Sequence, residues 1–114
     1  MPSDLLSPGV VAWAHLEPVV GREQGGRRPV VVISTRRYLE VIDTLAVVVP
    51  LTSTDRGWPN HVLIDGVEGL RPSFAMTEQP RTLSRARLRG VIGTASPQSL
   101  NEIRGWLNEF VCSE

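Results

Sequence analysis

The segment with the clearest chemical potential is residues 21–29, Gly-Arg-Glu-Gln-Gly-Gly-Arg-Arg-Pro, which joins two predicted strands. It is too long and too polar for a tight hairpin, and its glycines let backbone N–H groups approach a ligand closely. Pro29 restrains the backbone beside Arg28 where a buried strand begins, so the guanidinium is suited to bind a phosphate through two parallel hydrogen bonds. The alternative is a flexible linker with solvated arginines. The glycine spacing matches neither a Walker loop nor a dinucleotide-binding fingerprint.

An aromatic residue and a run of arginines are further candidates for contacts with a nucleic acid. Trp58 lies on a predicted loop beside Pro59 and is able to stack on an unpaired base, although a dimer contact or a plug for the sheet fits it equally well. Four arginines alternate with other residues after the fifth predicted strand, where they either contact phosphates or form a solvated face. These are Arg81, Arg85, Arg87 and Arg89.

Histidine, cysteine and metal chemistry have little support. Cys112 is the one cysteine, and with only His15 and His61 beside it the chain has no spaced set of metal ligands and no internal disulfide. A pair of catalytic histidines is disfavoured, because His15 alternates with Trp13 on a predicted strand and nothing brings His61 near it. We therefore expect no metal and no cofactor.

Short strands must position these residues. Apolar and β-branched runs bounded by glycine and proline predict strands at 10–16, 30–33 and 45–49. Weaker patterns predict strands at 61–65 and 73–77, and a strand at 88–95 whose two glycines suggest a bend or bulge.

One helix is predicted, with Ser96 as its N-cap and Pro97 at the first helical position. Several strands followed by a single helix predict a mainly β chain with a C-terminal helix, folded as a small, curled antiparallel barrel. The apolar stripe of the helix comprises Leu100, Ile103, Leu107, Phe110 and Val111, and Trp106 widens it.

Length and composition are those of one soluble domain: 114 residues, of which 41% are hydrophobic and 21% charged. We expect a polar tail at 1–8 and a single domain at 9–114. The longest apolar run, residues 45–49, is too short to span a bilayer, and the first residues lack a signal-peptide pattern, so we expect no membrane contact and a cytoplasmic protein.

The formal net charge is zero, but the charges are unevenly distributed. Residues 21–37 hold five arginines against one glutamate, and residues 81–104 do the same, whereas residues 38–80 hold two arginines against six acidic residues. If the two basic segments meet in space, they form a local anion-binding face.

Three blocks of the sequence resemble the MazF/PemK toxins, which are sequence-specific ribonucleases of bacterial toxin–antitoxin pairs. Residues 13–34 follow the family pattern W…L-x-P…G-x-E-Q-x-G-x-R-P-x-x-V-I-S, and the other blocks are Val-Val-Val-Pro-Leu-Thr-Ser at 47–53 and Glu-Gln-Pro-Arg-Thr at 78–82. Their order and spacing agree with the family over about residues 9–112. The chain departs from the usual pattern at Val10, where the family has an acidic residue, and at His15, where aspartate is common.

The resemblance implies an SH3-like curled barrel, a homodimer, an antitoxin partner and metal-independent cleavage of single-stranded RNA at a short sequence. By analogy Arg28 stabilises the transition-state charge and Thr52 hydrogen-bonds the scissile phosphate. Glu78 is the candidate general base, provided that burial raises its pKa, although Met76 replaces the arginine that PemK-like relatives have two residues before this acid. Glu23 is the rival base, or else an anchor of the loop near Arg28.

The same resemblance indicates which side chains contact RNA. The expected RNA-binding residues are Glu23, Gln24, Ser53, Trp58, Gln79 and Arg81.

Two alternative functions remain open. A non-enzymatic gyrase poison like CcdB shares the fold but lacks the pair Arg28 and Thr52, and a catalytically silent RNA-binding module differs only by the absence of turnover.

Overall fold

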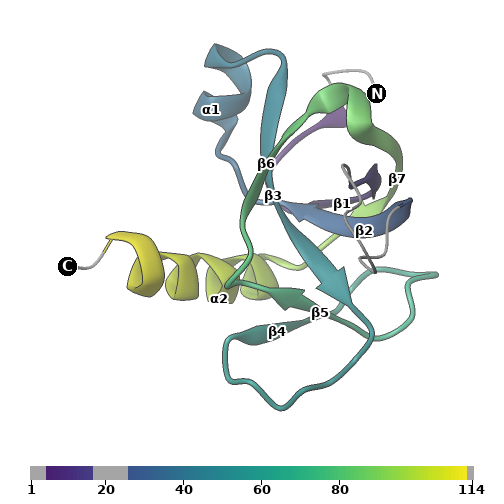
Figure 1. Ribbon diagram of the computed structural model, residues 1–114, viewed down its shortest axis with the longest axis vertical. Coiled ribbons are helices and arrows are strands. Elements are labelled where there is room, and N and C mark those ends of the chain that lie inside the picture. The colour runs from purple at the N-terminus through teal and green to yellow at the C-terminus, as the bar shows by residue number, and fades with distance from the viewer. Residues whose placement is uncertain (1–4, 17–25, 113–114) are drawn as a thin grey trace.

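The computed structural model describes residues 5–16 and 26–112, which form a curled antiparallel sheet with a helix along one end (Figure 1). Among these residues, no helix is long and apolar enough to cross a membrane. The strands are β1 (Val10–His15), β2 (Arg27–Val32), β3 (Leu45–Thr52), β4 (His61–Ile64), β5 (Ser73–Met76), β6 (Arg81–Ser84) and β7 (Leu88–Thr94). The helices are α1 (Arg36–Val41), the short 3₁₀ helix η2 (Arg85–Arg87), α2 (Pro97–Leu107) and the terminal π turn η3 (Asn108–Cys112).

The strands follow the spatial order β4-β5-β3-β2-β1-β7, and β6 pairs with the first half of β3. This arrangement confirms the predicted curled antiparallel sheet with a C-terminal helix, but the sheet is not closed into a barrel. The two ends of this path, β4 and β7, are not paired with each other. β6 and β7 follow one another through η2 and are joined end to end, with β6 hydrogen-bonded to β3 and β7 to β1.

Alternation along the strands fills two cores, one on each face of the sheet. Val11 and Val31 point to the face that packs against α2, where Ile103 is fully buried. Ala12 and Val30, their neighbours in sequence, point to the opposite face. Leu6 is also buried in that second core, a position that the expected polar tail at 1–8 did not anticipate.

The predicted helix begins as expected. The hydroxyl of Ser96 accepts a hydrogen bond from the backbone N–H of Ser99, and Pro97 occupies the first turn. The apolar stripe is correct only for its first part, because Phe110 and Val111 are 51% and 71% exposed. In Figure 1 the last turns of the helix project past the sheet, so these positions have no strand to pack against.

The glycines of β7 produce the predicted irregularity. The pairing of β1 with β7 shifts register between Val11 and Ala12 and again between Ala12 and Ala14. Gly90 has φ = +127°, a conformation that residues with a Cβ rarely adopt. These bulges bend β7 and let the arc from β6 wrap across the sheet.

Three elements were not predicted, α1, β6 and η2, and one buried arginine of η2 connects it to α1. Arg85 is only 6% exposed, and its guanidinium donates to the backbone carbonyls of Leu39, Ile42 and Leu45. Two of these carbonyls lie at the C-terminal end of α1, where a positive charge is favourable. The arginine expected on a phosphate-binding or solvated face therefore has a structural role.

Replacing Arg85 with methionine should lower the free energy of unfolding by about 3 kcal/mol, because three buried carbonyls lose a charged donor. Urea denaturation followed by circular dichroism measures this change. Arg36→Ala, on the exposed surface of α1, should change stability by less than about 0.5 kcal/mol. Equal effects of the two substitutions would contradict the structural role of Arg85.

Candidate functional site

Strand register brings Arg28 and Thr52 together. In the pairing of β2 with β3, Val30 lies opposite Pro50 and Val31 opposite Val49. Beyond this ladder β2 reaches back to Arg28 and β3 runs on to Thr52, so the two residues lie at adjoining ends of neighbouring strands. Both side chains are half-buried. A guanidinium and a hydroxyl, separated by 24 positions in sequence, therefore face one opening.

That opening is a groove of about 870 Å³, which we call the arginine groove. It is bounded by the ends of β1, β2 and β3 and by the loops that flank β4 and β5. Ser53 and Gln79, both expected to contact RNA, line it with Arg28 and Thr52. The other lining residues are Trp13, Arg27, Pro29, Leu51, Thr54, Arg56, Gly69, Leu70, Arg71, Ser73, Met76 and Ile92.

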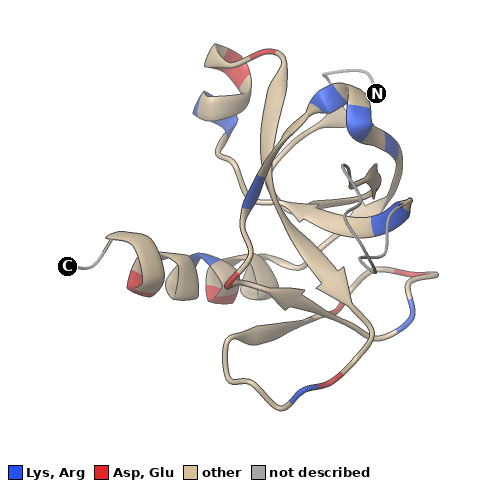
Figure 2. Cartoon of the chain, in the orientation of Figure 1, with Lys and Arg blue, Asp and Glu red and all other residues tan. Residues whose placement is uncertain are grey.

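Four arginines line the groove, and the described lining residues include no carboxylate. Figure 2 shows the positive charges at the start of β2 and in the loops before β4 and before β5. Arg27 and Arg28 come from a basic segment recognised in the sequence, whereas Arg56 and Arg71 come from a segment with a net negative charge. Sequence reasoning missed these two because summing charges along the chain hides an arginine among acidic neighbours.

The hydroxyl of Thr52 has a defined orientation. Its oxygen accepts a hydrogen bond from the backbone N–H of Thr54 at 3.2 Å. Because one lone pair is engaged in this turn, the O–H proton is directed elsewhere and is suited to donate to an anion in the groove. The loop continues through a second such turn, in which Asp55 accepts from the backbone N–H of Gly57 at 2.9 Å.

Glu78 lies outside the lining of the groove and is held by a cluster of polar side chains. Its Oε1 accepts from Asn60 Nδ2 at 2.9 Å and lies 3.0 Å from His61 Nε2, while Oε2 lies 3.1 Å from His61 Nε2 and accepts from Gln79 Nε2 at 3.3 Å. Thr77 closes the cluster by donating to the carbonyl oxygen of Asn60. Both carboxylate oxygens therefore already accept hydrogen bonds.

The pKa of Glu78 is the net result of opposing effects. Burial raises it, but hydrogen bonds from His61, from its own backbone N–H and from Gln79, together with the charge of His61 when protonated, outweigh burial and hold the pKa below its ordinary value. The raised pKa that a general base role for Glu78 required is thus absent, and a carboxylate with a lowered pKa is a weaker base.

Two of the expected RNA-binding residues lie elsewhere. Trp58 is not among the lining residues of the groove; its ring packs against the ring of His61, with centroids 4.9 Å apart, because the loop folds over the start of β4. Arg81 is directed away by its place in β6, where it pairs with Val48 of β3. The predictions for Glu23 and Gln24 fall outside the described residues.

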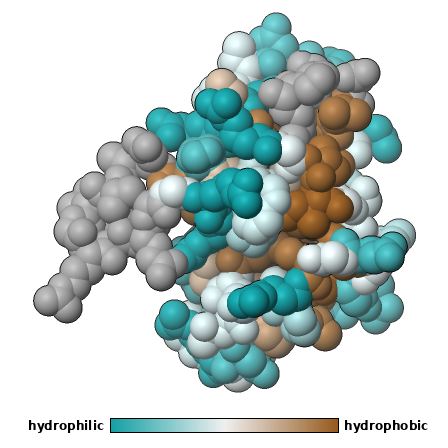
Figure 3. Space-filling model, turned by 90° about the vertical axis from the view of Figure 1, so that its right-hand side faces the viewer, coloured by the Kyte–Doolittle hydropathy of each residue, from teal (hydrophilic) through white to brown (hydrophobic). Residues whose placement is uncertain are grey.

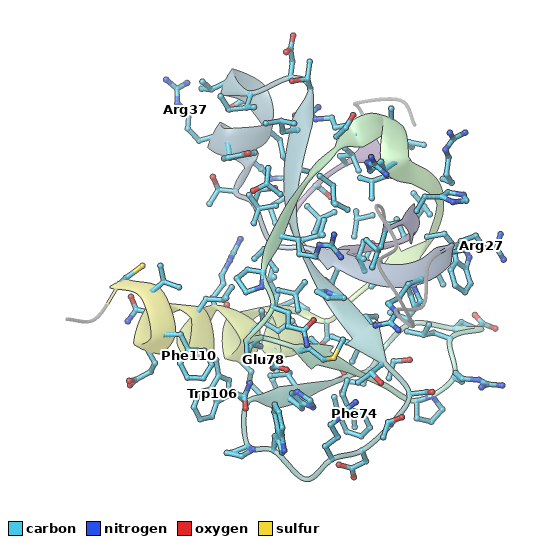
Figure 4. All side chains as sticks on the ribbon, in the orientation of Figure 1. Arg27, Arg37, Phe74, Glu78, Trp106 and Phe110 are labelled. Atoms are coloured by element: carbon cyan, nitrogen blue, oxygen red, sulfur yellow. The ribbon has the colours of Figure 1, made fainter. Side chains whose placement is uncertain are left out.

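His61 was not expected to take part in any site. Its side chain is 2% exposed and its Nδ1 has no hydrogen-bond partner among the described residues. No signal in the sequence indicated this position, because Leu63, which alternation places on the same face of β4, is 50% exposed. In Figure 4 Glu78, the partner of His61, and Arg27 at the start of β2 are labelled in different parts of the molecule.

The fold is a curled antiparallel sheet with one C-terminal helix, and four arginines make the groove at its strand ends suited to an anionic ligand. Comparison with known proteins gives the family: the profile described as PemK-like, MazF-like toxin of type II toxin-antitoxin system matches residues 7–111. The chain belongs to this family of toxins, which confirms the resemblance found in the sequence.

Relatives cover nearly the whole chain. The endoribonuclease toxin MazF of Escherichia coli strain K12 is 32% identical over 104 residues, which cover 90% of this chain and 91% of the relative. The crystal structure of MazF from Deinococcus radiodurans has a TM-score of 0.79 at 30% identity and covers 95% of this chain and 97% of its own. A MazE-MazF structure from the same organism has a TM-score of 0.78 at 30% identity, covering 96% and 97%.

The Glu78 cluster predicts a specific pH dependence of stability. Because the folded state lowers the pKa of Glu78 from its ordinary value of 4.5, the carboxylate stabilises the fold above that pH, and this contribution disappears as the pH falls through the lower folded pKa. Glu78→Gln should therefore lose less stability between pH 6 and pH 3 than the parent. Urea denaturation at a series of pH values tests this, and parallel curves for the two proteins would refute it.

Proposed function

We propose that this toxin is a sequence-specific endoribonuclease that cleaves single-stranded RNA without a metal ion. Relatives with the same fold over the same span carry the name endoribonuclease, which supports the class of activity. The observation that carries the proposal is that Arg28 at the start of β2 and Thr52 at the end of β3 line the same groove, together with three further arginines. A chain of phosphates is the natural occupant of such a groove.

The proposed reaction is an internal transfer at phosphorus. The ribose 2′-oxygen forms a bond to the adjacent phosphorus as its proton leaves, the bond to the 5′-oxygen breaks, and that oxygen takes up a proton. The products are a 2′,3′-cyclic phosphate and a 5′-hydroxyl. Arg28 binds the phosphoryl oxygens and stabilises the extra negative charge of the transition state, while Thr52 donates its O–H to the same group.

For Glu78 we propose a positioning role in place of general base catalysis. Its oxygens are engaged by Asn60, His61 and Gln79, and its pKa is lowered, so it is poorly suited to take the 2′-hydroxyl proton. It holds Gln79, which lines the groove, against the start of β4. Glu23 remains the rival candidate for the base, with solvent as the third possibility.

The proposed partners follow from the groove and the relatives. A MazE-MazF structure supports an antitoxin that binds this chain, and we propose that an acidic segment of the antitoxin covers the arginine groove and competes with RNA. We further propose a homodimer, supported by the exposed Phe110 beside Trp106, whose rings lie 5.7 Å apart at the end of the helix. We place the enzyme in the cytoplasm, where its RNA substrate is found.

The groove also bears on the two alternative functions, a gyrase poison and a silent RNA-binding module. A gyrase poison of this fold needs no pair of Arg28 and Thr52 facing one opening, and this chain has one. A silent RNA-binding module would keep the groove and lack turnover, so measurement of cleavage separates it from an enzyme.

Arg28→Ala and Thr52→Ala should each lower the rate of RNA cleavage at least a hundredfold, because each removes a stabilising contact with the transition state. A long RNA is incubated with the purified protein in excess EDTA, and the ends of the products are mapped. Parent enzyme should leave cyclic phosphate and 5′-hydroxyl ends.

Arg37→Ala is the matched control, because Arg37 is exposed on α1 (Figure 4) and outside the groove. It should cleave at the parental rate, and all variants should keep their melting temperature within a few degrees. Cleavage that stops with EDTA and returns with magnesium would overturn metal independence. Unfolding of the Arg28 and Thr52 variants would instead assign these residues to the fold.

Glu78→Gln should slow single-turnover cleavage less than about tenfold, because the amide preserves the shape of the side chain and most of its contacts. A general base would lose at least about a hundredfold with the same substitution, since an amide cannot accept the proton productively. Glu23→Gln, measured in parallel, tests the rival: a large loss there would assign the base to Glu23. A large loss in Glu78→Gln with RNA affinity unchanged would restore the catalytic role of Glu78.

A further inference from the structure

One arginine of the groove lies over an aromatic ring that also lines it. The guanidinium carbon of Arg27 is 4.4 Å from the centroid of the Trp13 ring, within the range of a favourable cation–π contact. Arg27 is exposed and Trp13 is half-buried, and both border the groove. In Figure 4 Arg27 projects from the end of β2 at the edge of the molecule.

The strand pairing sets where this pair lies relative to the proposed reaction. Trp13 is opposite Pro29 in the register of β1 with β2, one residue from Arg28, and β1 is two strands away from β3. Because neighbouring strands are about 4.8 Å apart, the backbone that carries Trp13 lies about 10 Å across the sheet from the strand of Thr52. A group bound at Trp13 is thus close to the scissile phosphate but separate from it.

The chemical character of the pair suits a nucleobase. Trp58, the aromatic residue expected to stack on RNA, packs on His61 and is 47% exposed but does not line the groove, whereas Trp13 is the aromatic ring among the described lining residues. Aromatic rings and the plane of an arginine guanidinium are the two surfaces on which proteins stack unpaired bases. Figure 3 shows the face of the molecule on the right-hand side of Figure 1, where hydrophilic side chains border a band of hydrophobic ones.

We propose that Trp13 and Arg27 form a base-stacking subsite for one nucleotide next to the cleaved bond. The inference rests on the proposed function, because it takes single-stranded RNA as the ligand of the groove. The base stacks on the pair, the guanidinium of Arg27 keeps its place beside the Trp13 ring, and Arg28 and Thr52 hold the neighbouring phosphate. Stacking tolerates any base, so the subsite contributes affinity and position more than base identity.

The test uses an RNA of about ten nucleotides spanning the mapped cleavage site, with a 2′-deoxy nucleotide at the cut so that it binds without reacting. If no cleavage is found, the tightest-binding RNA from a random pool replaces it, so the subsite is tested even if the enzymatic proposal fails. A single abasic nucleotide is then moved along the RNA, and dissociation constants are measured for each position. One position should weaken binding to the parent protein by about tenfold.

Trp13→Ala should bind the intact RNA about tenfold more weakly and show no further loss at that abasic position, because the stack is already removed. Trp13→Phe should retain most of the affinity. Arg27→Lys should lose affinity although it keeps the charge, since lysine has no planar group to stack. The matched control is Trp58→Ala, in which the full abasic penalty should persist.

A direct readout avoids any change at the subsite. In a Trp58→Phe, Trp106→Phe background, Trp13 fluorescence should be quenched by the intact RNA and much less by the RNA lacking the critical base. An abasic penalty that remains in Trp13→Ala, or an abasic scan without any sensitive position, would overturn the proposal. Weakened binding of an acidic antitoxin peptide with unchanged RNA affinity would also overturn it and assign the pair to a protein contact.

Discussion

Both edges of β3 are hydrogen-bonded, and the rest of the structure depends on this constraint. Along one edge its first half pairs with β6 and its end pairs with β5, while the other edge pairs with β2. One eight-residue strand thus belongs to both parts of the curled sheet. The same strand carries Thr52 at its end, so the position of the proposed catalytic hydroxyl is fixed by a strand that pairs with three others.

The charges of the groove impose a second constraint. Four guanidinium groups lining one opening repel one another, and part of this cost is offset by the contact of Arg27 with Trp13. An anionic ligand relieves the remainder, which gives the groove a strong preference for polyanions. Glu78, which would otherwise neutralise part of this field, is engaged by His61 and Asn60 outside the lining.

Packing of the loops explains why the polar cluster around Glu78 is separate from the arginine groove. The turn after β5 places Thr77 against the carbonyl of Asn60, and this buried hydrogen bond fixes the start of β4. His61 is then enclosed beneath Trp58, where it reaches both oxygens of Glu78. The wall of the groove beside β5 is consequently tied to β4 by hydrogen bonds, whereas on the side of β2 Arg27 is exposed and Arg28 is half-buried.

Much of this molecule could be predicted from local patterns. The β-branched runs around Val31 and Val48, the N-cap at Ser96 and the glycines of β7 act through backbone preferences and alternation that reach only a few residues along the chain. The position of Arg28 before Pro29 follows in the same way. Local patterns could not indicate α1, because the hydrogen bonds that hold its last turn come from Arg85, more than 40 residues away.

The sequence by itself determined every strand except β6, the helix start, the family and the choice of Arg28 and Thr52, which the fold places in one groove. Only the tertiary structure decided that Arg56 and Arg71 join the groove, that Trp58 covers His61, that Trp13 is the aromatic of the groove, and that Glu78 is held outside it. The physical reason is that a side chain on a loop takes its direction from the elements that the loop packs against. Those contacts form between residues far apart in sequence, and neither the periodicity of hydrophobic residues nor the charge of a segment predicts them.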